Sequence, residues 1–188
     1  GRKGDMSMSN DVFVWIEQNE GEADPISWQA MTAAGTLAKA LGGEMVALVM
    51  GEHIDDLSHK AAHYGADRVF STDDSSLNRF RLEPYAAVLT QLAQNETPAA
   101  IIMGTSRSAL ELSAYVAARL QVGLASDCTD LSVDSGQIVA TRPALIGNLI
   151  ATVRFKQSGS SMMTIRRNVF PPADQDTNRS VEVSSIPV

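Results

Sequence analysis

A chain of 188 residues and 20.1 kDa has room for one domain, and its apolar fraction of 44% is sufficient for a core. The formal charge of −7, with Arg166-Arg167 as the one local cluster of basic residues, disfavours a nucleic-acid partner. The apolar runs are too short to cross a bilayer, and the single Cys128 cannot form an internal disulfide, which indicates the cytoplasm or an organelle matrix such as the mitochondrial one.

The chain begins with the polar stretch "GRKGDMSMSN", which lacks the apolar segment of a secretory leader. We interpret residues 1–9 as an expression-derived remnant or a disordered leader around a native start at Met6 or Met8. They are excluded from the fold prediction that follows.

Short apolar runs alternate with helical patterns up to about residue 120. The runs predict strands at Val12–Ile16, Glu44–Met50, Arg68–Thr72 and Ala99–Gly104. The helical patterns cover Ser27–Leu41, Ile54–Tyr64, Glu83–Gln94 and Leu110–Leu120. Continuous apolar strands separated by helices are typical of a parallel sheet buried on both faces. The sequence therefore predicts a doubly wound α/β fold with a mostly parallel sheet and helices on both faces.

The pattern changes between about residues 125 and 167, where strand-like segments follow one another with only short turns. Asp134-Ser135-Gly136, Gly147-Asn148 and residues 157–159 are the turn signals, and they predict an annex of three or four antiparallel strands. Pro143 indicates a sheet edge or a bend. The α/β domain with this annex is expected over 10–170, and the Pro-, Asp- and Ser-rich segment 171–188 is expected to be a linker or tail.

With these elements in place, the chain resembles the N-terminal domain of the electron-transfer flavoprotein alpha subunit from about Asp11 to Val183. Four stretches carry the resemblance: "GADRV" at 65–69, "AARLQVGLASDCTDL" from 117, "TRPALIGNLIAT" from 141 and "MMTIRRNVF" from 162. The family often has Gly-Arg-Asp-Leu where this chain has "ALEL" at 109–112. Tyr115, Leu145-Ile146 and Arg167 are further departures from the family pattern.

The resemblance implies an adenine-nucleotide-hydrolase-like fold and a role as the scaffold and subunit-interface domain of an FAD-dependent electron carrier between dehydrogenases and an acceptor. It implies a heterodimer with a beta subunit, and places the FAD in a C-terminal domain beyond position 188. No cofactor or catalytic residue is therefore expected in this chain, which would be a carrier component and not an enzyme. The contacts that we expect with the flavin domain or the beta subunit are Arg142, Asn148 and Arg166.

Two loops that each follow a predicted strand are candidates for a phosphate site. The first carries Glu17, Glu20, Glu22 and Asp24, which would repel a phosphate, so Asp24 or Ser27 is interpreted as a helix cap. In the second, Gly104-Thr105-Ser106 near Arg107 could meet a phosphate, but capping of the next helix is the simpler interpretation. A stand-alone nucleotide-binding module of the universal-stress type stays the alternative function.

Other polar residues point to no reaction. His59 and His63 are four residues apart but have no third ligand at a supporting spacing, so we expect no metal site. Cys128 is interpreted as a buried structural thiol. Arg142, Arg154 and Arg166 fall on annex strands among apolar residues, and they either reach solvent or face a partner.

Overall fold

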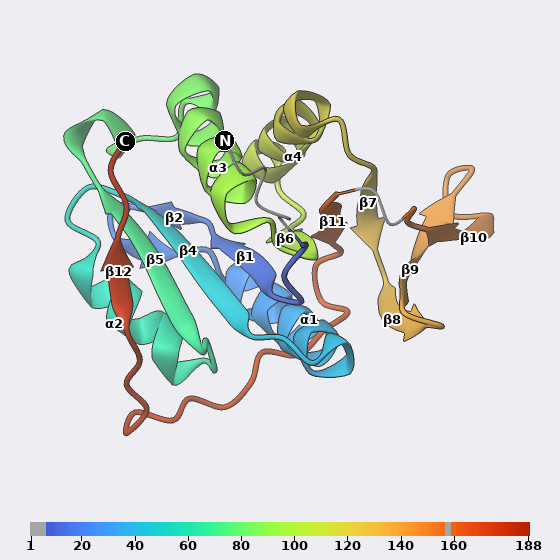
Figure 1. Cartoon of the computed structure of the whole chain (residues 1–188), viewed down its shortest axis with the longest axis horizontal. Coiled ribbons are helices and arrows are strands. Elements are labelled where there is room, and N and C mark those ends of the chain that lie inside the picture. Colours follow the sequence, from blue (N-terminus) through green and yellow to red (C-terminus); the bar gives the residue numbers. More distant parts are fainter. Residues whose placement is uncertain (1–6, 157–158) are drawn as a thin grey trace.

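The computed structural model describes residues 7–156 and 159–188. A parallel sheet of seven strands forms its centre, in the order β12-β5-β4-β1-β6-β11-β7 (Figure 1). The strands are β1 (Val12–Ile16), β4 (Met45–Gly51), β5 (Arg68–Asp73), β6 (Ala100–Gly104), β7 (Leu124–Cys128), β11 (Ser161–Ile165) and β12 (Val183–Ser185). All pairings in this sheet are parallel. The predicted doubly wound α/β class is confirmed.

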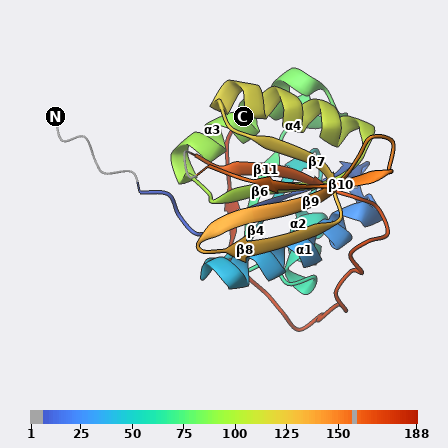
Figure 2. The ribbon, with the colours of Figure 1, turned by 90° about the vertical axis from the view of Figure 1, so that its right-hand side faces the viewer.

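Two helices cover each face of the sheet, as the turned view in Figure 2 shows. On one face lie α1 (Pro25–Leu41) and α2 (Asp55–His63), and on the other α3 (Leu82–Glu96) and α4 (Arg107–Leu120). Each face therefore has its own apolar layer, and a short 3-10 helix, η1 (Ser75–Leu77), leads into α3. The strands alternate their side chains between these two layers, which explains their continuous apolar sequences.

Local signals account for the ends of the helices. The Asp24 carboxylate accepts a hydrogen bond from the Ile26 backbone N–H, with Pro25 at the first helical position of α1. Gly42 ends α1 with a φ of 73°, a left-handed conformation that glycine adopts without strain. Ser106 caps α4 by accepting from the Ala109 N–H at 3.0 Å. The capping interpretations of Asp24 and Ser106 are confirmed.

The annex is smaller than the sequence predicted. Its antiparallel sheet has three strands in the order β10-β9-β8, namely β8 (Asp130–Asp134), β9 (Gln137–Ala144) and β10 (Leu149–Arg154). The segments before and after them, β7 and β11, belong to the parallel sheet. The predicted annex of three or four antiparallel strands is confirmed with three, but the expectation that it extends over about 125–167 was wrong: "SMMTI" is buried and lies between β6 and β7 in the parallel sheet.

The segment 171–188, predicted as a linker or tail, contains strand β12, which pairs with β5 through Val183 and Val69. Strand β12 was not predicted, because three residues are too few to show the periodic pattern of a strand. The first loop also holds a small hairpin, β2 (Gln18–Asn19) and β3 (Glu22–Ala23), that the sequence analysis did not predict. Whether 171–188 also leads to a further domain stays a prediction.

Two predicted features fall partly outside the described residues. Of the expected leader 1–9, residues 1–6 are not described, whereas the Ser9 N–H donates to the Thr97 carbonyl at 2.9 Å. Of the turn expected at 157–159, residues 157–158 are likewise not described. Among the described residues, none of the helices combines the length and apolar character that crossing a bilayer demands.

Candidate interface at the antiparallel hairpin

The hairpin of β9 and β10 projects from one flank of the molecule (Figure 1). Its strands pair from Val139 with Arg154 to Ala144 with Leu149, which leaves residues 145–148 as the loop. The Gly147 N–H donates to the Ala144 carbonyl at 3.1 Å, closing a tight turn. Both central residues, Leu145 and Ile146, have positive φ values of 47° and 57°. Gly, Asn or Asp normally occupies such positions, so a β-branched isoleucine here is strained.

This turn and the start of β10 form an exposed apolar surface, which we call the hairpin tip. Its relative exposures run from 55% to 103%. The tip consists of Leu145, Ile146, Leu149 and Ile150, which are four of the eight exposed large apolar residues in the described chain. Single exposed apolar residues are ordinary, but four at the end of one projecting hairpin, two in the turn and two on opposite faces of β10, are typical of a protein interaction site.

Arg142 and Arg166 lie at the base of the tip and line one cavity of about 510 Å³, together with Asp127 and residues 143–147. We call it the arginine cavity. The Arg142 Nε–H donates to the Ser126 carbonyl at 2.7 Å, so one edge of this half-buried guanidinium is held by the chain. Arg166 is exposed, and its Nη1 lies 3.9 Å from Asp127 Oδ2. Two of the three predicted contact residues are thus brought together, Arg142 from β9 and Arg166 from the residue after β11; the expectation that Arg166 lies on an annex strand was wrong, because β11 ends at Ile165 and belongs to the parallel sheet.

A β-bulge creates this arrangement. Between β7 and β11 the register shifts, with Met163 opposite Ala125 and Ile165 opposite Cys128, so β7 has one extra residue there. Asp127 lies in this bulge with a φ of 58°, and its backbone N–H donates to Thr164 Oγ1 at 2.8 Å. Bulges commonly redirect side chains at sheet edges, and this one brings the Asp127 carboxylate to the arginine cavity.

The other annex residues have different surroundings. Asn148, the third predicted contact, lies in the turn, where its backbone N–H donates to the Leu145 carbonyl at 3.2 Å. Arg154 lies at the opposite end of β10 and contacts the Asp134 carboxylate at 2.6 Å. This hydrogen bond is the main reason why the pKa of Asp134 is lowered. Arg154 therefore links β10 to the end of β8 instead of facing the arginine cavity.

Cys128 lies where the annex joins the parallel sheet, and it is fully buried. Burial raises the pKa of its thiol to about 12, an effect that the nearby Arg142 opposes and Asp127 reinforces. A thiol with so high a pKa is protonated and unreactive at neutral pH. The interpretation of Cys128 as a structural residue therefore agrees with its position.

The loop after β6 has structural partners throughout. A side chain at Gly104 would collide with Ile26 of α1 at 2.4 Å, so glycine permits the close packing of helix and strand. Thr105 Oγ1 lies 2.9 Å from Thr164 Oγ1, and Ser106 caps α4. Arg107 is exposed and lies 3.5 Å from Glu111. These contacts favour the capping interpretation of the loop over a phosphate site.

The histidine pair shows no metal geometry. His59 Nε2 lies 3.6 Å from Asp55 Oδ1 on the same helix. Within 7–156 and 159–188, no group of three or more His, Cys, Asp or Glu side chains is arranged to hold a metal ion.

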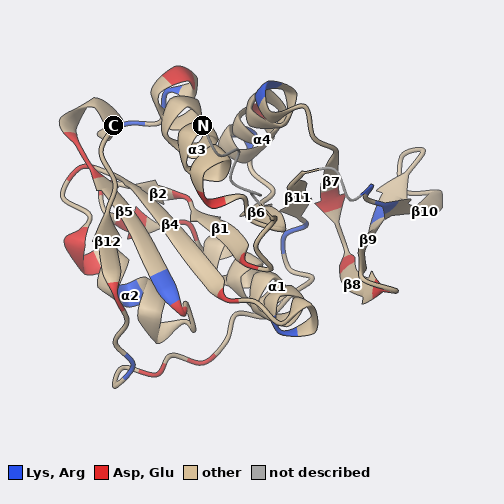
Figure 3. Cartoon of the chain, viewed as in Figure 1, with Lys and Arg blue, Asp and Glu red and all other residues tan. Residues whose placement is uncertain are grey.

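Lys and Arg are spread over many elements in Figure 3 and do not gather on a single face.

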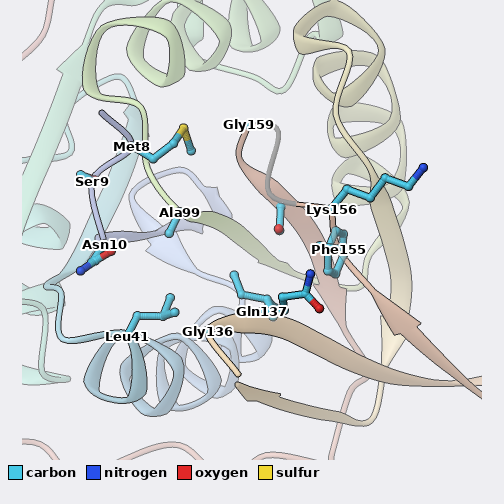
Figure 4. A pocket seen from close by; sticks show the side chains of 12 residues that line it. Met8, Ser9, Asn10, Leu41, Ala99, Gly136, Gln137, Phe155, Lys156 and Gly159 are labelled. Carbon is cyan, nitrogen blue, oxygen red and sulfur yellow. The ribbon is translucent and has the colours of Figure 1, made fainter. Parts of the chain in front are cut away.

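Figure 4 shows a cavity of about 290 Å³ at the amino ends of the central strands. Met8, Leu41 and Phe155 contribute apolar walls, and Gln137 lies between the main sheet and the annex. Lys156 extends away from the cavity. Its lining combines apolar walls with neutral polar residues and Lys156, and it includes no carboxylate, histidine or cysteine among the described residues.

The molecule is a doubly wound α/β domain with an antiparallel annex. The family model described as "Electron transfer flavoprotein domain" matches residues 12–188, and the chain belongs to this family. The chain is 33% identical over 181 residues to the electron transfer flavoprotein subunit alpha of Bacillus subtilis, covering 96% of this chain and 55% of that protein. The predicted family is confirmed.

Two further relatives carry other names. Protein FixB of Clostridium saccharobutylicum is 35% identical over 167 residues, which cover 88% of this chain and 50% of that protein. Subunit LctC of the lactate dehydrogenase (NAD(+),ferredoxin) of Acetobacterium woodii is 32% identical, covering 88% of this chain and 40% of LctC. The chain therefore spans about half the length of these curated relatives.

Arg142 and Arg166 were predicted through the family resemblance, whereas the hairpin tip was not predicted. The stretch "ALIGNLI" did contain a signal, because two bulky apolar residues precede Gly147-Asn148 at a turn. Turns usually carry polar residues and glycine, so bulky apolar residues there indicate a contact beyond the strand pair.

Proposed function

We propose that this chain is the N-terminal, alpha-type domain of an electron transfer flavoprotein and that the hairpin tip and the arginine cavity form its interface with the rest of the carrier. The family match and the alpha-subunit relatives support the alpha-type assignment. The single observation that carries the interface is the cluster of four exposed apolar residues at the end of the hairpin, two of which line a cavity with Arg142 and Arg166. Apolar anchors combined with arginine are the usual composition of binding hot spots.

The proposed carrier binds FAD through a part of the protein outside this chain. The residues at the carboxyl ends of β1 and β6 do not fit the FAD pyrophosphate. Glu17, Glu20 and Asp24 surround the first loop with negative charge, and Gly104 is packed against Ile26. The proposal therefore gives this domain a scaffold role, with a beta subunit as its partner and dehydrogenases as electron donors to the whole carrier.

The test is to reconstitute the longer alpha-type subunit with its beta partner and to measure the dissociation constant for Arg142→Ala and Arg166→Ala. Loss of a buried interfacial arginine costs about 2 kcal/mol or more of binding. Arg107→Ala on α4 is the matched control, because its side chain is 95% exposed. Unchanged affinity for both cavity variants, together with a large loss of fold stability, would mean that the arginines support the annex internally.

A further inference from the structure

A second cavity, of about 460 Å³, lies at the carboxyl end of β1, far from the hairpin in the strand order. It is lined by the loop after β1, by residues 78–80 after η1, by Tyr85 of α3 and by Ser108 of α4. The chain runs from β1 to β4 on one side and later reaches β6 on the other side of β1. In open α/β sheets, ligands bind at such a reversal of strand order.

Two polar atoms at this cavity are buried without a hydrogen-bond partner in the described chain: Trp15 Nε1 and Glu17 Oε2. Trp15 is only 2% exposed, and both residues line the cavity. One atom is a donor and the other an acceptor, and leaving either unpaired destabilises the fold. A bound molecule with one acceptor and one donor would satisfy both.

Three aromatic residues that contact one another, Trp15, Phe80 and Tyr85, line the same cavity. The centroids of Trp15 and Phe80 lie 6.0 Å apart, those of Trp15 and Tyr85 6.2 Å, and those of Phe80 and Tyr85 5.2 Å. The Tyr85 hydroxyl is directed to the Leu77 carbonyl at 2.8 Å, which fixes its ring. Ring faces attract cations, and the attraction grows when water is excluded.

The charges around Glu17 favour a cation over an anion. Glu17, Glu20 and Arg79 are the charged residues that line the cavity, and Glu22 and Asp24 lie with Glu17 along a neighbouring cavity, where Asp24 is paired with Arg167 at 3.2 Å. Burial raises the pKa of Glu17 and Asp24 adds to this effect, whereas hydrogen bonding of the carboxyl group with Ser106 and Ser108 and the charge of Arg167 oppose it; Oε2 is the oxygen without a partner in the described chain. A poorly solvated carboxylate of this kind gains most from a positively charged partner.

We propose that this cavity binds a small molecule that carries a primary ammonium group next to an oxygen acceptor, the chemistry of amino alcohols and amino acids. The ammonium group donates to Glu17 Oε2 and contacts the aromatic rings, and the oxygen accepts from the indole N–H of Trp15. Phosphate-bearing ligands such as AMP are rejected by Glu17, Glu20 and Asp24. The site is independent of the hairpin interface.

The experiment follows the indole N–H resonance of Trp15 by NMR in the 188-residue chain, with ethanolamine as the probe. The chain has two tryptophans, so the variant Trp28→Phe identifies the Trp15 signal. Ethanolamine should shift it in a saturable way, while N-acetylethanolamine, which lacks the charge, and AMP should not. No saturable shift with ethanolamine, or an equal shift with N-acetylethanolamine, would overturn the proposal.

Glu17→Gln separates binding from a structural role. Because it removes a desolvated charge, this variant should melt at a higher temperature than the unaltered chain at pH 7, and this gain should vanish below the ordinary pKa of 4.5. Its affinity for ethanolamine should fall about tenfold or more, as for a lost charged hydrogen bond. Glu83→Gln, an exposed change in the first turn of α3, is the matched control: it should leave the affinity for ethanolamine unchanged and should not raise the melting temperature. A Glu17→Gln variant that binds ethanolamine normally would contradict the site.

Discussion

The two flanks of the parallel sheet differ in what covers them. At the β5 flank, the chain returns along α2 and adds β12 to the sheet edge. Arg179 fixes this return by donating to Asp67 Oδ1 at 2.7 Å and to the Ala66 carbonyl at 3.1 Å. The Asp176 N–H donates to the His63 carbonyl at 2.9 Å. This flank is covered by its own chain.

At the β7 flank, the chain leaves the sheet as a three-stranded annex and keeps its apolar tip exposed. The root of the annex is closed around the buried Cys128, whereas Ile146 at the end of the turn is fully exposed and adopts a strained φ. The segment 171–188 covers the β5 flank and packs Val181, Val183 and Ile186 against the core, whereas the apolar residues of the hairpin tip have no such cover in the described chain. This difference favours a second protein surface as the cover of the hairpin tip.

The largest effect is expected from charging the tip. The double variant Ile146→Asp and Leu149→Asp should weaken association of the longer subunit with its partner by about 2–4 kcal/mol, because apolar anchors dominate interfaces. Its free energy of unfolding should change by no more than about 0.5 kcal/mol, since both side chains are exposed. Leu110→Asp, an exposed apolar position on α4, is the control, and equal weakening there would argue against a specific tip.

Alkaline pH should lower the free energy of unfolding through Cys128, which lies where the annex joins the parallel sheet. Folding raises the pKa of Cys128 from its ordinary value of 9.0 to about 12, so the protonated thiol stabilises the fold below pH 9 and that contribution is lost as the pH rises towards 12. Between pH 8 and 10.5 the loss should reach on the order of 1–2 kcal/mol. Thermal unfolding of the unaltered chain and of Cys128→Ala at both pH values measures it. An equal alkaline loss in Cys128→Ala would show that another group is responsible.

A smaller effect is expected at the covered flank. Arg179→Ala removes the hydrogen bonds that hold the return segment, so the unfolding free energy should fall by about 1 kcal/mol. The melting temperature should drop by about 2–4 °C. Hydrogen exchange of Val183–Ser185 should accelerate, while partner affinity stays unchanged. Arg107→Ala serves again as the exposed control, and a loss of affinity in Arg179→Ala would mean that this flank also contacts the partner.

The smallest effect tests the strain in the turn. Ile146→Gly should raise the unfolding free energy by about 0.5 kcal/mol, because glycine adopts a φ of 57° freely. The neighbouring strand position gives the matched control: Ile150→Gly should be destabilising, since glycine weakens a strand. Denaturant unfolding measures the free energy of unfolding of both variants and of the unaltered chain. Destabilisation by Ile146→Gly would show that the isoleucine is packed within the domain.

Several features of the fold followed from sequence pattern alone. Continuous apolar runs such as Val12–Ile16 predicted a strand buried on both faces, and the helix after the first loop was predicted with Asp24 or Ser27 as its cap, of which the structure has Asp24. Local patterns do not specify which distant strand is the neighbour. For this reason β11 was expected in the annex, although its partners β6 and β7 lie in the parallel sheet.

The candidate site was less accessible to prediction. Arg142 and Arg166 entered through the family resemblance, and nothing local shows that they share one cavity. The bulge at Asp127 depends on the register of two paired strands, which the sequence does not display. The alternation of residue types in β10 likewise indicated that the strand has two different faces. In the structure β10 is the edge strand of a three-stranded sheet, and Leu149 and Ile150, on opposite faces, are both exposed.

The most direct measurement is hydrogen exchange of the hairpin in three samples: the 188-residue chain, the longer alpha-type subunit, and that subunit bound to its beta partner. If the hairpin tip is covered in the carrier, amides between Thr141 and Ile150 should exchange more slowly in the longer subunit or in the complex than in the 188-residue chain. Those of Val183–Ser185 should exchange at the same rate in all three, because their own chain already covers that flank. Equal exchange of the hairpin in all three samples would contradict an interface there.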